Sequence, residues 1–139
     1  MIELLKVELL TDYPIFSGWW KKRGLKMPPE QCFLPAEGWM ARNGIPLAAS
    51  WLYTVPSARG GIGVIEFTVS NPDAEFADRT LGIAKIYERL EDIARLRGCG
   101  SVLSFVVPEK GGEKTFVEKL GYKDIGDGPH RTFGKALWQ

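Results

Sequence analysis

Histidine and cysteine are scarce in this sequence, which has one histidine and two cysteines in 139 residues. A single histidine argues against the multi-histidine centres that hold zinc or paired metals, so we expect no metal site. A Ser-His-Asp triad would have to use His130, which lies in a stretch rich in glycine and proline near the end of the chain. Cys32 and Cys99 lie far apart and form no disulfide framework, so we expect two reduced thiols.

Long apolar runs and net charge are also lacking. The sequence has no stretch of about 18 apolar residues, which a membrane-spanning helix would need. The apolar N-terminus is interrupted by Glu3, Lys6 and Glu8, which is not typical of a signal peptide. A formal net charge of +1 provides no broad basic surface for nucleic acid. We therefore expect a cytoplasmic protein with no membrane partner, and the charge argues against a nucleic-acid partner.

The remaining composition, 45% hydrophobic and 25% charged, is ordinary for a globular protein, and the length suits one domain over residues 1–139. Asn43-Gly44 lies between two apolar runs and predicts a β-hairpin, because both residues tolerate positive φ. The pattern predicts these elements: strand 2–10, helix 13–23 with Thr11-Asp12 as its N-cap, a short helix from Pro28, strands 37–42, 46–55 and 62–69, helix 80–97, strand 101–107, helix 111–120, and strands near 122–126 and 131–137. This order predicts a mixed α/β (α+β) fold, with six to seven strands and helices on both faces of the sheet.

The join between strand 62–69 and helix 80–97 carries the most informative motif. Arg79-Thr80-Leu81-Gly82-Ile83-Ala84 has the form R-x-x-G-x-A. A helix N-terminus offers unpaired N–H groups and the positive end of the helix dipole, which suit a pyrophosphate. Gly82 has no Cβ, so an anion could approach the backbone there, and Arg79 adds a positive charge. The motif therefore predicts an anion site at the start of the long helix.

With this motif the chain resembles the GNAT superfamily of acetyl-CoA-dependent N-acetyltransferases, whose marker is Q/R-x-x-G-x-G/A at the same join. Arg79, Gly82 and Ala84 match it. The segment 116–122, F-V-E-K-L-G-Y, is similar to a second family segment, L-Y-E-K-L-G-F. The order of the elements also matches the family, so the resemblance covers nearly the whole chain.

The resemblance implies a mostly antiparallel sheet in which strands 62–69 and 101–107 form one parallel pair that splays apart. In the family, the pantetheine arm of acetyl-CoA lies in that gap. The cofactor contacts that it implies here are the backbone of Phe67 and Val69 for pantetheine, and Arg79 with the amides of Leu81, Gly82, Ile83 and Ala84 for the pyrophosphate.

Glu66 is the candidate general base, since it is the only acid in the strand that borders the predicted cofactor gap. Tyr53, on the neighbouring strand, is a second catalytic candidate that could donate a proton. Trp19 and Trp20 point about 100° apart on a helix, so we expect that one of them lines the substrate groove and the other the core.

Two other functions stay open beside the acyltransferase. A catalytically degenerate module that binds coenzyme A or a partner is favoured by Val117, which occupies the family's usual tyrosine slot, and by the acidic loop 70–78. A nucleic-acid-modifying relative is suggested only by the run W-W-K-K-R at 19–23. The amine acceptor cannot be named from the sequence, and a homodimer remains open.

Overall fold

The computed structural model describes residues 1–25, 27–58, 60–106, 118–125 and 131–137. Within these ranges seven strands form one sheet in the order β1-β2-β3-β4-β5-β7-β6, and only β4 and β5 run parallel. The elements are β1 (Glu3–Lys6), α1 (Leu9–Lys22), the 3-10 helix η1 (Gln31–Phe33), β2 (Glu37–Asn43), β3 (Ile45–Val55), β4 (Ile62–Ser70), α2 (Phe76–Leu96), β5 (Ser101–Val106), β6 (Lys123–Asp124) and β7 (Arg131–Ala136).

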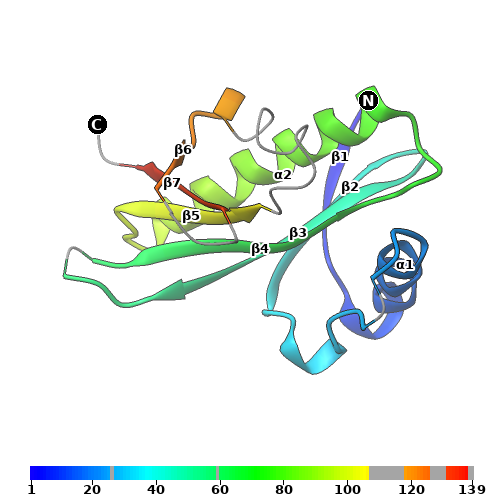
Figure 1. Cartoon of the computed structure of the whole chain (residues 1–139), viewed down its shortest axis with the longest axis horizontal. Helices are drawn as coiled ribbons and strands as arrows, with labels where there is room; N and C mark the ends of the chain where they lie inside the picture. Colours follow the sequence, from blue (N-terminus) through cyan, green and yellow to red (C-terminus); the bar gives the residue numbers. More distant parts are fainter. Residues whose placement is uncertain (26, 59, 107–117, 126–130, 138–139) are drawn as a thin grey trace.

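Helices α1 and α2 lie on opposite faces of the sheet, as the sequence predicts (Figure 1). Residues of α2, among them Ile86 and Leu90, pack with Leu52 and Ile65 of the sheet into one apolar core. On the other face, Phe16 and the two tryptophans of α1 pack with Trp51 and Val69 into a second core. Successive side chains along each central strand therefore point alternately into the two cores, which fixes the face on which each strand residue lies.

Both tryptophans of α1 are buried, so the expectation that only one could face the core is wrong. Trp19 is 7% exposed and Trp20 is 6% exposed. Trp19 lies edge-on to Phe16, with ring centroids 5.5 Å apart, and Trp20 stacks on Trp51 at 6.0 Å. Indole side chains are long enough for two neighbours on a helix to reach the same sheet surface from different angles.

Most predicted elements are confirmed, and the main differences are at helix starts. The hairpin at Asn43-Gly44 is present, with Gly44 at φ 74° between β2 and β3. Helix α1 begins at Leu9 rather than 13, and the backbone N–H of its N-cap residue Glu8 donates to Asp12 Oδ2 at 2.8 Å. Helix α2 begins at Phe76 rather than 80. The predicted helix 111–120 lies largely outside the described residues.

Strand β4 contains an irregularity that positions the site. Trp51 of β3 pairs with Glu66, and Ala49 pairs with Val69, so a single β3 residue lies opposite the two residues Phe67 and Thr68. Such an extra residue is a β-bulge, and it bends its strand. Phe67 adopts φ 62°, the one positive φ among described residues other than glycine.

Beyond the bulge, β4 and β5 separate. They pair only over Ile62–Ile65 and Ser101–Ser104, although β4 continues to Ser70. Figure 1 shows β5 ending while β4 runs on. From Glu66 onward β4 has no described strand on its β5 side. The splayed parallel pair implied by the family resemblance is therefore present.

None of the helices in the described ranges is both long and apolar enough to cross a bilayer.

The close contact between Gly38 of β2 and the fully buried Trp51 gives a test of the α1-side core. A Cβ at Gly38 would overlap Nε1 and Cδ1 of the Trp51 indole. We expect Gly38→Ala to lower the free energy of unfolding by about 1–3 kcal/mol or more, because the ring must move in a packed core. Urea denaturation measures this.

The matched control is Gly18→Ala in α1, where a Cβ meets nothing within 4 Å. Alanine is a better helix former than glycine, so this variant should be unchanged or up to about 1 kcal/mol more stable. Equal effects of the two substitutions would contradict the packing of Trp51 on Gly38.

Candidate functional site

An open, mainly apolar pocket lies on the α1 face of the sheet, with a volume of about 640 Å³. Its floor is formed by Tyr53 of β3 with Glu66 and Phe67 of β4. The remaining walls come from the segment that connects α1 to β2, through Leu25, Met27, Pro29, Phe33 and Pro35. The pocket therefore combines one acidic side chain with a surround of apolar ones.

Glu66 and Tyr53 form a hydrogen-bonded pair in this pocket. The Tyr53 hydroxyl donates to Glu66 Oε2 at 2.8 Å, and both side chains are half-buried. Trp51 pairs with Glu66 across the strands, which places Glu66 and Tyr53 on the same face of the sheet. The pairing of β4 with β5 ends at Ile65 and Ser104, and Glu66 is the next residue of β4. The two catalytic candidates from the sequence are thus side by side where the two strands separate.

The phenol of Tyr53 holds its proton tightly. Burial, together with the hydrogen bond to Glu66 and the negative charge of that carboxylate, raises the pKa of Tyr53 from 10.0 to about 12. At neutral pH Tyr53 is therefore a hydrogen-bond donor and not a base. It fixes one oxygen of Glu66 and leaves the other available.

A chain of hydroxyl groups bridges the gap between β4 and β5. Ser50 Oγ lies 2.7 Å from Thr68 Oγ1, which lies 3.3 Å from the hydroxyl of Tyr87. The Tyr87 hydroxyl lies 2.9 Å from Ser104 Oγ. Tyr87 belongs to α2, so this helix places a polar group between the two strands just where their pairing ends.

The residues of the predicted pyrophosphate site lie inside helix α2 and not at its start. Because α2 begins at Phe76, the amides of Leu81, Gly82, Ile83 and Ala84 lie in its second and third turns, where N–H groups bond to carbonyls four residues earlier. A Cβ at Gly82 would lie 3.1 Å from Ala41 Cβ. Gly82 therefore lets α2 approach the sheet closely, which is a packing role.

Arg79 keeps a feature compatible with an anion contact. Its Nε is buried and has no hydrogen-bond partner among the described residues. Its guanidinium lies 5.6 Å from the centre of the Phe76 ring. The amides that a helix leaves unpaired belong to its first turn, which here carries Asp78 and follows the exposed Glu75.

The basic run after Trp20 binds the loop between β4 and α2. Lys22 Nζ lies 2.8 Å from Asp73 Oδ2, and Arg23 donates to the carbonyl and the hydroxyl of Ser70 at 3.0 and 2.7 Å. These contacts tie the end of α1 to the acidic loop. They give Lys22 and Arg23 structural partners within the chain.

Several expected site residues lie elsewhere. Trp19 and Trp20 pack in the core and do not line the pocket. His130 and Val117 lie outside the described residues. Cys32 is exposed and Cys99 is buried, and both are free, as predicted. Within the described ranges no three His, Cys, Asp or Glu side chains are grouped so as to hold a metal ion.

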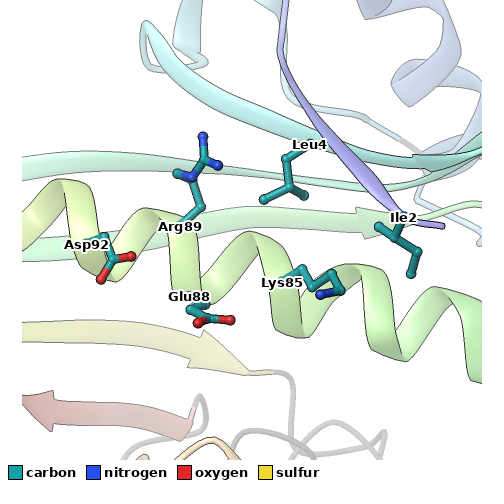
Figure 2. Close-up of a pocket in the computed structure, with 6 residues that line it drawn as sticks. All are labelled: Ile2, Leu4, Lys85, Glu88, Arg89 and Asp92. Carbon is teal, nitrogen blue, oxygen red and sulfur yellow. The ribbon is translucent and has the colours of Figure 1, made fainter.

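A second hollow, of about 340 Å³, lies between β1 and α2 and is lined by Ile2 and Leu4 together with charged residues of the helix. Figure 2 shows Arg89 extending from α2 toward the strand that carries Leu4, with Glu88 and Asp92 on the same helix. The Arg89 guanidinium lies 4.6 Å from the centre of the Trp39 ring. The hollow is lined by exposed charged side chains of both signs, which is typical of a solvated helix surface.

Two buried carboxylates outside the pocket have structural partners. Glu37 accepts a hydrogen bond from Arg97 at 2.6 Å. Glu91 accepts from the Tyr122 hydroxyl at 2.8 Å and from Lys135 Nζ at 3.0 Å, which ties the last strands to α2. Neither carboxylate is open to a ligand in the way that Glu66 is.

Sequence reasoning missed the pocket walls and the hydroxyl chain. Leu25, Met27 and Phe33 lie in a segment without helical or strand periodicity, so no pattern assigned them a face. Their one signal was that large apolar residues occur in a proline-containing connection, where a solvent-exposed loop would carry polar ones. Tyr87 looked like a core residue of an amphipathic helix.

No protein-family model matches the chain, and no curated protein matches it. Among solved structures, an N-acetyltransferase from Staphylococcus aureus Mu50 superposes with a TM-score of 0.70 at 13% identity, over 100% of this chain and 99% of that one. An acetyltransferase from Streptococcus agalactiae 2603 gives 0.72 at 16%, over 98% of each chain. N-acetylglutamate synthase from Neisseria gonorrhoeae, complexed with coenzyme A and N-acetylglutamate, gives 0.74 at 14%, over 100% of this chain and 36% of that one. The chain therefore has the N-acetyltransferase fold, and the resemblance drawn from the sequence is confirmed at that level.

The residues present suit one part of coenzyme A better than another. The gap beside β4 from Glu66 onward suits the extended pantetheine arm, because it borders a strand with no described neighbour on that side. The helix turns at 81–84 do not suit the diphosphate, because their amides are already bonded. Arg79 Nε is the described donor that remains unpaired near this motif.

The raised pKa of Tyr53 gives a pH test. The phenol ionises near 10.0 in the unfolded chain and near 12 in the folded protein. Between these values the unfolded state binds fewer protons, so the free energy of unfolding falls as the pH rises. We expect the stability advantage of wild type over Tyr53→Phe, measured by urea denaturation, to shrink through this range. A difference that does not change with pH there would contradict the raised pKa.

Proposed function

We propose that this protein is an N-acyltransferase that moves an acyl group, acetyl in the simplest case, from acetyl-CoA to an amine in a ternary complex. The observation that carries this proposal is the Glu66–Tyr53 pair at the floor of an open pocket, placed where β4 and β5 separate in an N-acetyltransferase fold. Acetyl-CoA and the amine would approach from the two sides of the same stretch of β4. The cytoplasmic location expected from the sequence is part of the proposal.

Glu66 is the general base in this proposal. An alkylamine has a pKa of about 10.4 and is protonated at neutral pH, so its nitrogen must lose a proton before it can attack a thioester. The free oxygen of Glu66 accepts that proton, while Tyr53 holds the other oxygen in place. The nitrogen then bonds to the acyl carbon, the carbon–sulfur bond breaks, and the second proton of the nitrogen passes through water or a nearby hydroxyl to the departing thiolate.

Acetyl-CoA supplies an activated thioester. In this chain the backbone of Phe67 and Val69, on the free side of β4, is the candidate for holding the pantetheine arm. Arg79 is the candidate for a phosphate contact, on the basis of its unpaired Nε. The left-handed φ of Phe67 redirects the β4 backbone at this point, and such a conformation costs about 1–3 kcal/mol unless the surroundings hold it.

One observation favours a second candidate function, a module that binds a partner or a ligand without catalysing transfer. The amides at 81–84 lie beyond the first turn of α2 and are bonded within the helix, so they are not free to hold a diphosphate. A protein with this fold and without that cradle would bind coenzyme A weakly or not at all.

Coenzyme A binding separates these two candidates. We expect coenzyme A and acetyl-CoA to raise the melting temperature of wild type, since a ligand at 100 times its Kd adds about 2.7 kcal/mol to the free energy of unfolding. Arg79→Ala should reduce this stabilisation. The matched control is Arg95→Ala, near the other end of α2, whose side chain pairs with Asp92. No stabilisation of wild type by either ligand would favour the second candidate.

The role of Glu66 is tested by turnover. Free thiol release is followed with a panel of primary amines, against a blank that corrects for the exposed Cys32. We expect Glu66→Gln to lower kcat by about 10²–10⁴-fold with little change in coenzyme A affinity, because the amide has the size of the acid and not its basicity. Glu88→Gln, an exposed acid on α2, is the control and should retain full activity. An unchanged kcat in Glu66→Gln, with chemistry rate-limiting, would exclude Glu66 as the base.

A further inference from the structure

The walls of the pocket are unusually apolar for an exposed surface. Met27 is 87% exposed, Phe33 is 68% exposed and Leu25 is 44% exposed, and all three border the same hollow. Single exposed apolar residues are common, but several around one concave site are typical of a binding surface. The volume of about 640 Å³ is in the range that small organic ligands occupy.

The charge in the pocket selects among ligands. Glu66 is the only charged side chain among the described lining residues, and Tyr53 and Glu66 are the only polar ones. A carboxylate in apolar surroundings attracts a cation and repels an anion, and both effects are stronger than in water because the local dielectric constant is lower. The described lining offers no positive partner for a carboxylate or a phosphate on the ligand.

We propose that the acceptor is a small primary monoamine with an apolar body and no acidic group, and that it binds with its nitrogen at Glu66 and its body against Leu25, Met27 and Phe33. That this amine is the acceptor rests on the proposed function. Its binding in the pocket does not require turnover. Burying an apolar body against these side chains removes exposed apolar surface from both partners, which provides the favourable free energy.

The same lining argues against free amino acids as acceptors. An amino acid would carry its carboxylate within a few bonds of the nitrogen that Glu66 binds, so the two negative charges would lie close together. Burial of an unpaired carboxylate is costly. The apolar amine should therefore be preferred over the amino acid that has the same carbon skeleton.

Four probes of matched shape test this inference by calorimetry on the protein without an acyl donor. They are heptylamine, its ether analogue 2-(2-methoxyethoxy)ethylamine, the amino acid 2-aminooctanoic acid, and 1-heptanol. We expect heptylamine to bind at least about 10-fold more tightly than the ether amine, because an apolar pocket discriminates by about that factor or more for small changes in apolar content. The amino acid and the uncharged alcohol should also bind at least about 10-fold more weakly than heptylamine.

Variants locate the site. Met27→Ser should weaken heptylamine binding several-fold, whereas Leu96→Ser should not, and the two side chains are equally exposed at 87%. Glu66→Gln should weaken the binding of heptylamine and leave that of 1-heptanol nearly unchanged. Because Met27 is exposed, its replacement is not expected to unfold the protein, and a melting curve of each variant checks this.

The outcomes separate this inference from the proposed function. Tighter binding of the ether amine or of the amino acid, or equal losses in Met27→Ser and Leu96→Ser, would overturn the apolar-amine site. If acetyl transfer is found with the amino acid and not with heptylamine, the inference fails and the proposed function stands. If heptylamine binds as expected and no amine is acylated, the binding site stands and the proposed function fails.

Discussion

The extra residue in β4 is the feature on which the rest of the site depends. Two residues, Phe67 and Thr68, lie opposite one residue of β3, and the strand bends there. The bend ends the pairing of β4 with β5 after Ile65, and it brings Glu66 to the end of the paired region. From Glu66 onward the edge of β4 has no described strand on its β5 side.

The two faces of this bend have different chemistry. On the α1 face, Glu66 and Tyr53 lie in a hollow with apolar walls, so the carboxylate is the dominant polar feature there. In the gap itself, hydroxyl groups of Ser104, Tyr87 and Thr68 bridge from one strand to the other. A carboxylate on one side and neutral hydroxyls on the other would suit the proton removal and the hydrogen bonding that the proposed transfer needs.

The sequence predicted the sheet and its hairpin well, because period-two alternation and Asn43-Gly44 are local signals. It predicted the helix starts poorly. The motif at 79–84 suggested that the long helix begins near residue 80, but the helix has a further turn from Phe76 onward, and Gly82 packs against Ala41. Tertiary packing overrode the local signal there. The bulge at Phe67 had no signal, since a left-handed φ at a phenylalanine follows from pairing with β3 and not from the residue type.

The walls of the pocket belong to a connection that contributes little to either core. Leu25, Met27 and Phe33 are exposed, and of the described residues in the segment 25–36 only Leu34 is among the buried core residues. The segment follows α1, whose end is tied to the neighbouring loop by an exposed ion pair between Lys22 and Asp73, a kind of contact worth about 0–1 kcal/mol. Substitutions along this segment can therefore change what the pocket accepts at little cost to folding. Among proteins that descend from a common ancestor, ligand preference would therefore diverge first through this segment, while Glu66 and the two cores stay the same.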